Sequence, residues 1–144
     1  MTKELVVDTS VAVSWALDDE RNPDCERILT AVRTESVQLT VPDLWLYEGL
    51  NAIRSATLRR RLPVWSASAS AKFLCELPKT VVPVTESRAS EILDVSLREG
   101  LTVYDAAYLA LARERNADLI TWDKELLALP DPGVRIISPE QLQP

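Results

Sequence analysis

The sequence predicts an α/β sandwich with a central, mainly parallel β-sheet. Short apolar runs rich in β-branched residues alternate along the chain with longer segments of helical periodicity, which is the pattern of a parallel sheet covered by helices. The chain has 144 residues, 47% of them hydrophobic, and contains no internal repeat or low-complexity segment. Because this length suits one core, we expect residues 1–144 to form a single domain.

The first predicted strand is the most apolar one. Leu5, Val6 and Val7 form a continuous run, as expected for a strand that is buried on both faces of a sheet. The other predicted strands cover residues 37–41, 81–84, 118–122 and 134–137.

The predicted helices lie between these strands. Pro42 and Pro63 each precede a long helical segment, because proline is favoured in the first turn of a helix. Gly100 is a natural stop for the helix before it, since glycine readily adopts the left-handed conformation that ends many helices. The predicted helices cover residues 11–17, 24–34, 43–61, 63–76, 87–99, 103–114 and 124–129.

The composition excludes several kinds of chemistry. The chain contains no histidine, which removes Ser-His and Cys-His nucleophilic schemes and the usual zinc site with histidine ligands. Any catalysis must therefore use carboxylates, hydroxyls, lysine or a bound metal ion. The net charge of -6 argues against broad, non-specific binding to nucleic acids, which requires a basic surface. It leaves open a nucleic-acid enzyme whose acidic centre is neutralised by divalent cations.

The sequence also bears on where the protein acts. No stretch resembles a signal peptide or a membrane span, since the N-terminal apolar run is short and is interrupted at Asp8. Cys25 and Cys75 match no metal-binding or redox spacing and are expected to be reduced core or helix residues. We therefore expect a cytoplasmic protein with no membrane partner.

Two acids directly follow predicted strands. Asp8 ends the first strand and is followed by the hydroxyl residues Thr9 and Ser10. In open parallel α/β sheets, ligands bind just beyond the carboxyl ends of the strands, where Asp8 would lie. Asp123 ends a later strand in the same way, with Thr121 two residues before it. In both places the alternative is a residue that caps the following helix.

Two further acids lie on apolar helical segments. Asp105 is the only charged residue between Gly100 and Arg113, and a helix this apolar is expected to be buried. A lone buried carboxylate is costly unless it is paired or bound to metal, although an acid in the first turn is also favoured by the helix dipole. Glu48 lies on a mostly apolar stripe, with Asn51 one turn later to hydrogen-bond the carboxylate or a ligand. A solvated glutamate is the alternative.

These acids could converge on one pocket, since two lie at strand ends and two on apolar helix faces. Carboxylates that converge repel one another and so require cations. Ligand sets made only of oxygen suit Mg²⁺ or Mn²⁺. The four candidate ligands are Asp8, Glu48, Asp105 and Asp123.

In order, spacing and context, these residues resemble the PIN-domain nucleases, particularly the VapC-type toxins of type II toxin–antitoxin pairs. The resemblance covers essentially the whole chain. Trp122 departs from the family pattern, in which small residues are common at this place. The segments that carry the resemblance are Val6-Val7-Asp8-Thr9-Ser10, Pro42 through Glu48 to Asn51, Leu101 through Asp105 to Ala112, and Thr121-Trp122-Asp123.

The resemblance implies a PIN-like three-layer α/β/α sandwich and an endoribonuclease that depends on Mg²⁺ or Mn²⁺ and inhibits translation. One or two ions would generate hydroxide from bound water, orient it for in-line attack on an RNA phosphodiester and stabilise the departing oxygen. The implied catalytic and metal-binding residues are Asp8, Glu48, Asp105 and Asp123. The implied supporting residues, which hold the loop beside Asp8 or position water, are Thr9, Ser10, Asn51 and Thr121.

The resemblance also implies protein partners. A cognate antitoxin would hold the toxin inactive with a tail that lies in a groove beside the acidic site, and a homodimer is expected. Trp15, Trp45 and Trp65 suit either such an interface or the core, with the core as the stronger expectation. RNA would be held by local basic patches such as Arg54 with residues 59–61, although such a run is often a solvated helix end.

Other functions fit the sequence less well. A phosphatase of the haloacid-dehalogenase kind needs a second aspartate two residues after the first, and Ser10 occupies that position. A receiver domain is disfavoured because it needs an acidic pair before a phosphorylatable aspartate in its third strand. A non-catalytic PIN-like protein that binds RNA or regulates is the remaining alternative. Such chains usually lose one or more of the acids, and all four are present here.

Overall fold

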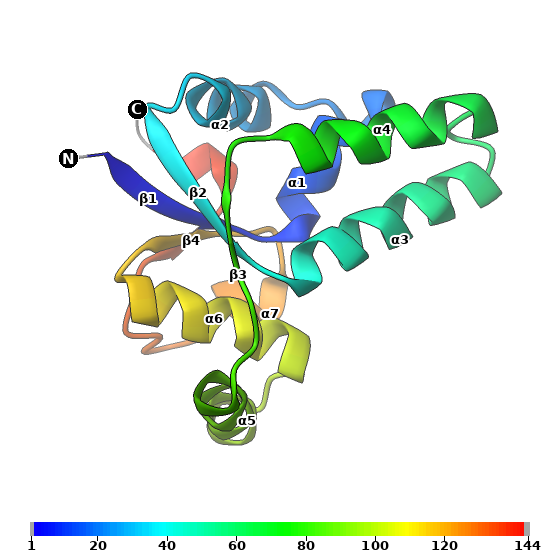
Figure 1. The fold of residues 1–144 in the computed structure, drawn as a ribbon. Helices are drawn as coiled ribbons and strands as arrows, with labels where there is room; N and C mark the ends of the chain where they lie inside the picture. The colour runs from blue at the N-terminus through cyan, green and yellow to red at the C-terminus, as the bar shows by residue number, and fades with distance from the viewer. Residues whose placement is uncertain (1, 143–144) are drawn as a thin grey trace.

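The computed structural model describes residues 2–142, in which the central sheet has five strands in the order β3-β2-β1-β4-β5 (Figure 1). Every pairing between neighbouring strands is parallel, so the predicted mainly parallel sheet is confirmed. The strands are β1 (Lys3–Val7), β2 (Val37–Pro42), β3 (Thr80–Val82), β4 (Asp118–Ile120) and β5 (Ile136–Ile137).

Helices cover both faces of this sheet, which confirms the three-layer α/β/α sandwich (Figure 1). On one face lie α1 (Thr9–Ala16) and α2 (Pro23–Arg33), and on the other lies α6 (Val103–Arg115) with α5 (Glu86–Glu99) packed on it. The remaining long helices, α3 (Leu44–Leu58) and α4 (Val64–Glu76), form a hairpin that contacts α1 and extends beyond the sheet. The short helix α7 is Lys124–Leu127, and 3-10 turns cover Asp18–Glu20 and Pro139–Gln141.

Local sequence explains where several helices begin and end. The Asn22 side chain accepts hydrogen bonds from two backbone N–H groups at the start of α2, and Thr85 and Thr102 each accept one at the starts of α5 and α6. Gly100 adopts φ +70° at the end of α5, which confirms the predicted stop.

Some predicted boundaries were wrong. Helix α3 was predicted to reach residue 61 but ends at Leu58, because the chain turns through Arg60 with φ 60°. Strand β3 ends at Val82 instead of residue 84, since the next residue is Pro83, which has no N–H for the sheet. Strand β4 also stops early, because the backbone N–H of Trp122 donates to a side-chain hydroxyl and not to a neighbouring strand.

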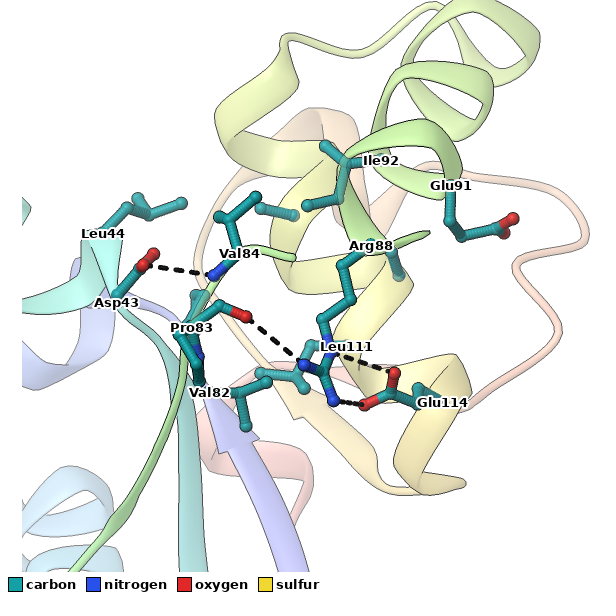
Figure 2. A pocket seen from close by; sticks show the side chains of 13 residues that line it. Asp43, Leu44, Val82, Pro83, Val84, Arg88, Glu91, Ile92, Leu111 and Glu114 are labelled. Atoms are coloured by element: carbon teal, nitrogen blue, oxygen red, sulfur yellow. Dashed lines mark hydrogen bonds and ion pairs between the residues drawn. The ribbon is translucent and has the colours of Figure 1, made fainter. Parts of the chain in front are cut away.

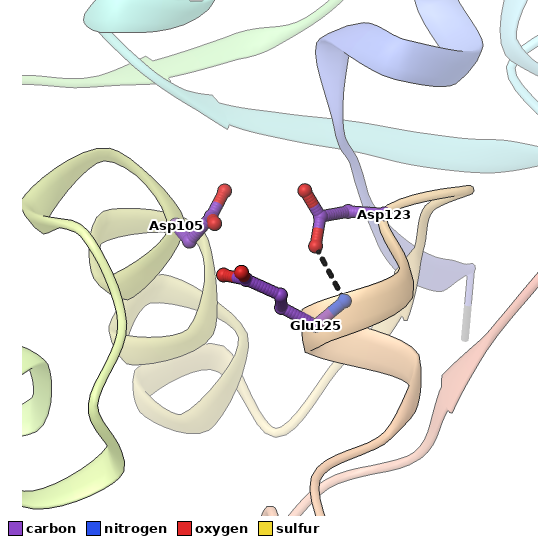
Figure 3. A group of neighbouring side chains, drawn as sticks. All are labelled: Asp105, Asp123 and Glu125. Carbon is purple, nitrogen blue, oxygen red and sulfur yellow. Dashed lines mark hydrogen bonds between the residues drawn. The ribbon is translucent and has the colours of Figure 1, made fainter.

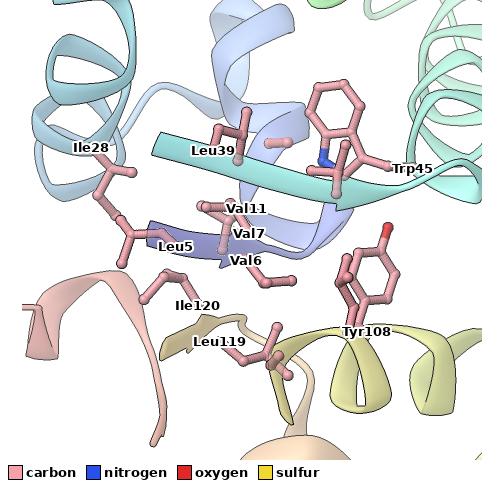
Figure 4. Close-up of a cluster of buried hydrophobic side chains, with 14 of the residues drawn as sticks. Leu5, Val6, Val7, Val11, Ile28, Leu39, Trp45, Tyr108, Leu119 and Ile120 are labelled. Carbon is pink, nitrogen blue, oxygen red and sulfur yellow. The ribbon is translucent and has the colours of Figure 1, made fainter. Parts of the chain in front are cut away.

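The core lies on both sides of β1, as predicted for this strand (Figure 4). Leu5, Val6 and Val7 are all fully buried. Trp15 and Trp45 are also buried, but the expectation that all three early tryptophans are core residues was wrong for Trp65, which is 84% exposed on α4. Within residues 2–142, no helix is long and apolar enough to cross a membrane.

The buried strand β4 provides a test of how much this core stabilises the protein. Leu119 is fully buried, so Leu119→Ala is expected to lower the free energy of unfolding by about 2–5 kcal/mol through the cavity that it leaves. Leu97→Ala is the matched control, because Leu97 is 75% exposed on α5, and it should change this free energy by less than about 0.5 kcal/mol. Urea unfolding followed by circular dichroism measures both, and equal losses would contradict the assignment of the core.

Candidate active site

The carboxyl ends of β1 and β4 lie side by side and form the floor of the site. Val7 pairs with Ile120 in the sheet, and the backbone N–H of Asp8 continues the ladder by donating to the Ile120 carbonyl at 2.9 Å. This register places the residue that follows β1 next to the residue that follows β4. Asp8 is therefore beside Thr121, 113 residues later in the chain.

Asp8 lies at the first position before α1, but its side chain makes no capping hydrogen bond. Its Oδ2 instead accepts from the hydroxyls of Thr121 at 2.7 Å and Ser10 at 2.9 Å. Both bonds use the same oxygen, so Oδ1 has no side-chain donor within residues 2–142. The capping alternative therefore does not describe this nearly buried carboxylate.

Glu48 projects from α3 and is held in a similar way. Its Oε1 accepts from the hydroxyl of Tyr108 at 2.6 Å and from that of Thr9 at 3.1 Å. No hydrogen bond within residues 2–142 uses Oε2. Asn51 also faces the site, but it makes no hydrogen bond to Glu48 in the described part of the chain.

Asp105 and Asp123 face each other across the site, together with Glu125 (Figure 3). Each of the three carboxylates offers an oxygen, and these oxygens lie within 4.8 Å of one another. Asp123 does cap α7, since its Oδ1 accepts from the backbone N–H groups of Glu125 at 2.9 Å and Leu126 at 3.1 Å. Within residues 2–142 its Oδ2 accepts no hydrogen bond, so capping and a role in the site are compatible for Asp123.

The four acids named from the sequence share one open cleft of about 550 Å³. Tyr47, Val13 and Ala52 complete its wall, and Thr121 lies beneath it through its bond to Asp8. The predicted residues that line the cleft are Asp8, Thr9, Ser10, Glu48, Asn51, Asp105 and Asp123.

Hydroxyl groups connect the acids of the cleft to one another. Thr121 donates to Asp8 and accepts from the backbone N–H of Asp123 at 2.9 Å, so one side chain links two of the acids. Ser10 accepts from the backbone N–H of Trp122 at 3.1 Å, which joins α1 to the segment after β4. The bulky Trp122 indole donates to Glu140 and so has a partner of its own.

The electrostatics of the cleft favour a loss of negative charge. Burial raises the pKa of Asp8 and of Glu48, and hydroxyl donors partly offset this rise. Burial and then the charge of Asp123 raise the pKa of Asp105 to about 6. Protonation or a bound cation would relieve this repulsion.

Two residues of the site were not predicted from the sequence, namely Glu125 and Tyr108. Glu125 follows Asp123 by two residues in the first turn of α7, where it looks like an ordinary surface acid. Tyr108 follows Asp105 by three residues on an apolar helix, where it looks like a core aromatic. For both residues, the only sequence feature that pointed to the site was their short distance along the chain from a candidate acid.

Other surface features bear less directly on the cleft. Arg61 pairs with Asp19 and Glu20, so this member of the predicted basic patch is already neutralised.

An apolar cavity of about 70 Å³ lies between β3, α5 and α6, where Arg88 pairs with Glu114 (Figure 2). None of the four candidate acids lines that cavity.

The raised pKa of Asp105 predicts how stability depends on pH. With a folded-state pKa of about 6 against an ordinary value of 3.8, Asp105 ionises more easily in the unfolded chain, so it destabilises the fold as pH rises through this window. In EDTA, Asp105→Asn should therefore raise the melting temperature by a few degrees at about pH 7.5 and leave it almost unchanged at about pH 3, below the ordinary pKa of the group. Asp131→Asn, at an exposed loop position, is the control and should have no effect at either pH. A gain of the same size for both variants would contradict this explanation.

Known proteins resemble this chain over nearly its whole length. A family model described as PIN domain matches residues 5–132, a range that contains every acid of the cleft. Ribonuclease VapC3 of Pyrobaculum aerophilum is 32% identical over 126 residues, which cover 85% of this chain and 92% of that relative. The crystal structure of PAE2754 from Pyrobaculum aerophilum has a TM-score of 0.71 at 27% identity and covers 94% of this chain and 83% of that chain.

A toxin-antitoxin complex from Klebsiella pneumoniae shares the fold alone, with a TM-score of 0.60 at 15% identity, over 96% of this chain and 99% of that chain. The family match includes the ends of β1 and β4 and the helices that bring their acids to the cleft. The acids at the carboxyl ends of the strands agree with these matches. The chain belongs to the PIN domain family.

Proposed function

We propose that this chain is a single-domain endoribonuclease that depends on Mg²⁺ or Mn²⁺ and hydrolyses RNA phosphodiester bonds. One observation carries the proposal. Carboxylates from four separate parts of the chain converge on one open cleft, and within residues 2–142 each has an oxygen that accepts no side-chain hydrogen bond. Oxygens of Asp105 and Asp123 face each other at close range together with one of Glu125, an arrangement that suits the binding of a cation better than a structural role.

The set of donors fits a hard divalent cation. The facing oxygens of Asp105, Asp123 and Glu125 are close enough to share one ion. The chain has no histidine, and neither cysteine lines the cleft, so the donors are oxygens. Asp8 and Asp105 would be the principal ligands, with Asp123 next, and Glu48 would act partly through water.

When bound, such an ion acts as a Lewis acid and lowers the pKa of a coordinated water. The chain itself supplies orientation. Ser10 and Thr121 hold Asp8, while Tyr108 and Thr9 hold Glu48, so that the free oxygen of each carboxylate is directed by fixed hydroxyl donors. The open shape of the cleft leaves room for a phosphodiester strand to approach the acids.

A toxin role accounts for a second feature of the surface. The VapC3 relative is named a ribonuclease, and the Klebsiella neighbour is a toxin-antitoxin complex, which support a toxin that inhibits translation and is held by a cognate antitoxin. Large exposed hydrophobic side chains on the α3–α4 hairpin, beginning with Tyr47 at the cleft, would suit the antitoxin tail. Further along the hairpin these are Leu58, Val64 and Trp65. A homodimer is part of the same proposal.

RNA cleavage tests the nuclease proposal directly. The purified protein should cleave RNA with Mg²⁺ or Mn²⁺ and stop when EDTA is added. Asp8→Asn should reduce the rate by at least about 100-fold, since loss of a ligand should cost no less than loss of a group that orients one. Asp131→Asn makes the same change of charge outside the cleft and should keep the wild-type rate.

Cleavage that survives both EDTA and Asp8→Asn would contradict the metal-ligand roles. No cleavage under any of these conditions would favour the non-catalytic alternative, in which the fold binds RNA or regulates without hydrolysing it.

Expression in cells tests the toxin role. Induction in a bacterial host should halt the incorporation of labelled methionine, whereas the Asp8→Asn variant should allow it to continue. Co-expression with the product of a short neighbouring gene should restore incorporation and give a complex that co-purifies. Size-exclusion chromatography with light scattering on the free protein should show a dimer. Normal protein synthesis during strong expression of an active nuclease would contradict the toxin role.

A further inference from the structure

We propose that Tyr108 is a positioning residue of the nuclease site, which fixes the Glu48 carboxylate so that its Oε2 is available to the cation. The proposal rests on the metal-dependent function proposed above. Tyr108 does not line the cleft and would touch neither the ion nor the RNA. It acts through Glu48.

The geometry is a closed triangle of three side chains from three helices. The Tyr108 hydroxyl on α6 donates to Glu48 Oε1 on α3 at 2.6 Å, and Thr9 Oγ1 on α1 lies 2.8 Å from the Tyr108 hydroxyl and 3.1 Å from the same Oε1. Each hydroxyl has a single hydrogen: Tyr108 donates its hydrogen to Oε1, and Thr9 donates its own either to Oε1 or to the Tyr108 oxygen. In both arrangements the short bond from Tyr108 restricts rotation of the carboxylate. The unbonded Oε2 then has a single preferred direction.

The hydroxyl of Tyr108 is not needed for packing. The residue is 1% exposed among the core side chains, where phenylalanine would fill nearly the same volume (Figure 4). A buried hydroxyl lowers stability unless it is hydrogen-bonded, and within residues 2–142 its bonds go to Glu48 and Thr9 alone. The hydrogen bond to the Glu48 carboxylate therefore explains why this buried position has a tyrosine hydroxyl.

Tyr108 also connects the two sides of the cleft. It follows Asp105 by three residues and so lies on the same side of α6, one turn further along. Through Glu48 it joins the helix that carries Asp105 to α3, which approaches the site from the other side. The bond sets where two proposed ligands lie relative to each other, although the residues are 60 positions apart.

A double-mutant cycle on metal affinity tests this inference without RNA. Mn²⁺ binding to the EDTA-stripped full chain is measured by calorimetry for wild type, Tyr108→Phe, Glu48→Gln and the double variant. Tyr108→Phe should weaken binding by about 10- to 100-fold, the usual effect of losing a group that orients a ligand. In the Glu48→Gln background the same change should have almost no further effect, because its target carboxylate is gone.

Tyr104→Phe is the matched control, since Tyr104 lies on the same helix but is 64% exposed, and it should bind Mn²⁺ as wild type does. Circular dichroism and melting temperature verify that each variant folds. If Tyr108→Phe does not fold, Thr9→Val removes the other donor of the triangle and should also weaken binding in a manner that depends on Glu48.

The outcomes separate the two proposals. Wild-type affinity in Tyr108→Phe, or an equal loss with and without Glu48, overturns the positioning role while leaving the nuclease intact. Failure of the wild-type chain to bind Mn²⁺ overturns the metal-dependent function and this inference with it.

Discussion

The burial of several carboxylates close to one another is the constraint on which the arrangement of this molecule depends. Acids that follow β1 and β4 share one cleft with acids from the helices α3 and α6. Burial, together with the negative charge of neighbouring acids, raises the pKa of Asp8, Glu48 and Asp105. Such a cluster lowers stability unless fixed donors or a cation offset it. The protein provides donors to one oxygen of Asp8, of Glu48 and of Asp123, while the other oxygen accepts no side-chain hydrogen bond in the described part of the chain. Under the proposed function, this division turns an unfavourable cluster into a site that would attract a cation.

The parallel sheet places the hydroxyl donors next to the carboxylates that they hold. Because β1 and β4 are neighbours in register, their ends bring Asp8 and Thr121 together, and Thr121 then also reaches the backbone of Asp123. Helix α6 carries Asp105 and Tyr108 on one side, so a single rigid helix supplies both an acid and the hydroxyl that holds Glu48. The acids are thus placed by regular elements and by the residues next to them, which allows less movement than long loops would.

The same arrangement explains how an acidic protein could act on RNA. A net charge of -6 repels a phosphate backbone, yet under the proposed function a cation held by these acids would reverse the local charge where the phosphodiester would bind. Membership of the PIN domain family is consistent with this chemistry. Outside the cleft, the exposed hydrophobic side chains of the α3–α4 hairpin are of the kind that mark protein contacts, and Trp65 is the largest of them.

The sequence by itself determined the parallel α/β fold and the positions of the four acids. It could do so because hydrophobic periodicity reports burial, and because a charged residue within an apolar pattern is conspicuous. It left the capping alternatives open, did not identify Glu125 or Tyr108 as site residues, and favoured the core over an interface for Trp65. Only the tertiary structure decided that Asp123 caps a helix while Asp8 does not, and which oxygen of Glu48 is free. These outcomes depend on hydrogen bonds between residues up to 113 positions apart, and local sequence patterns carry no information about such contacts.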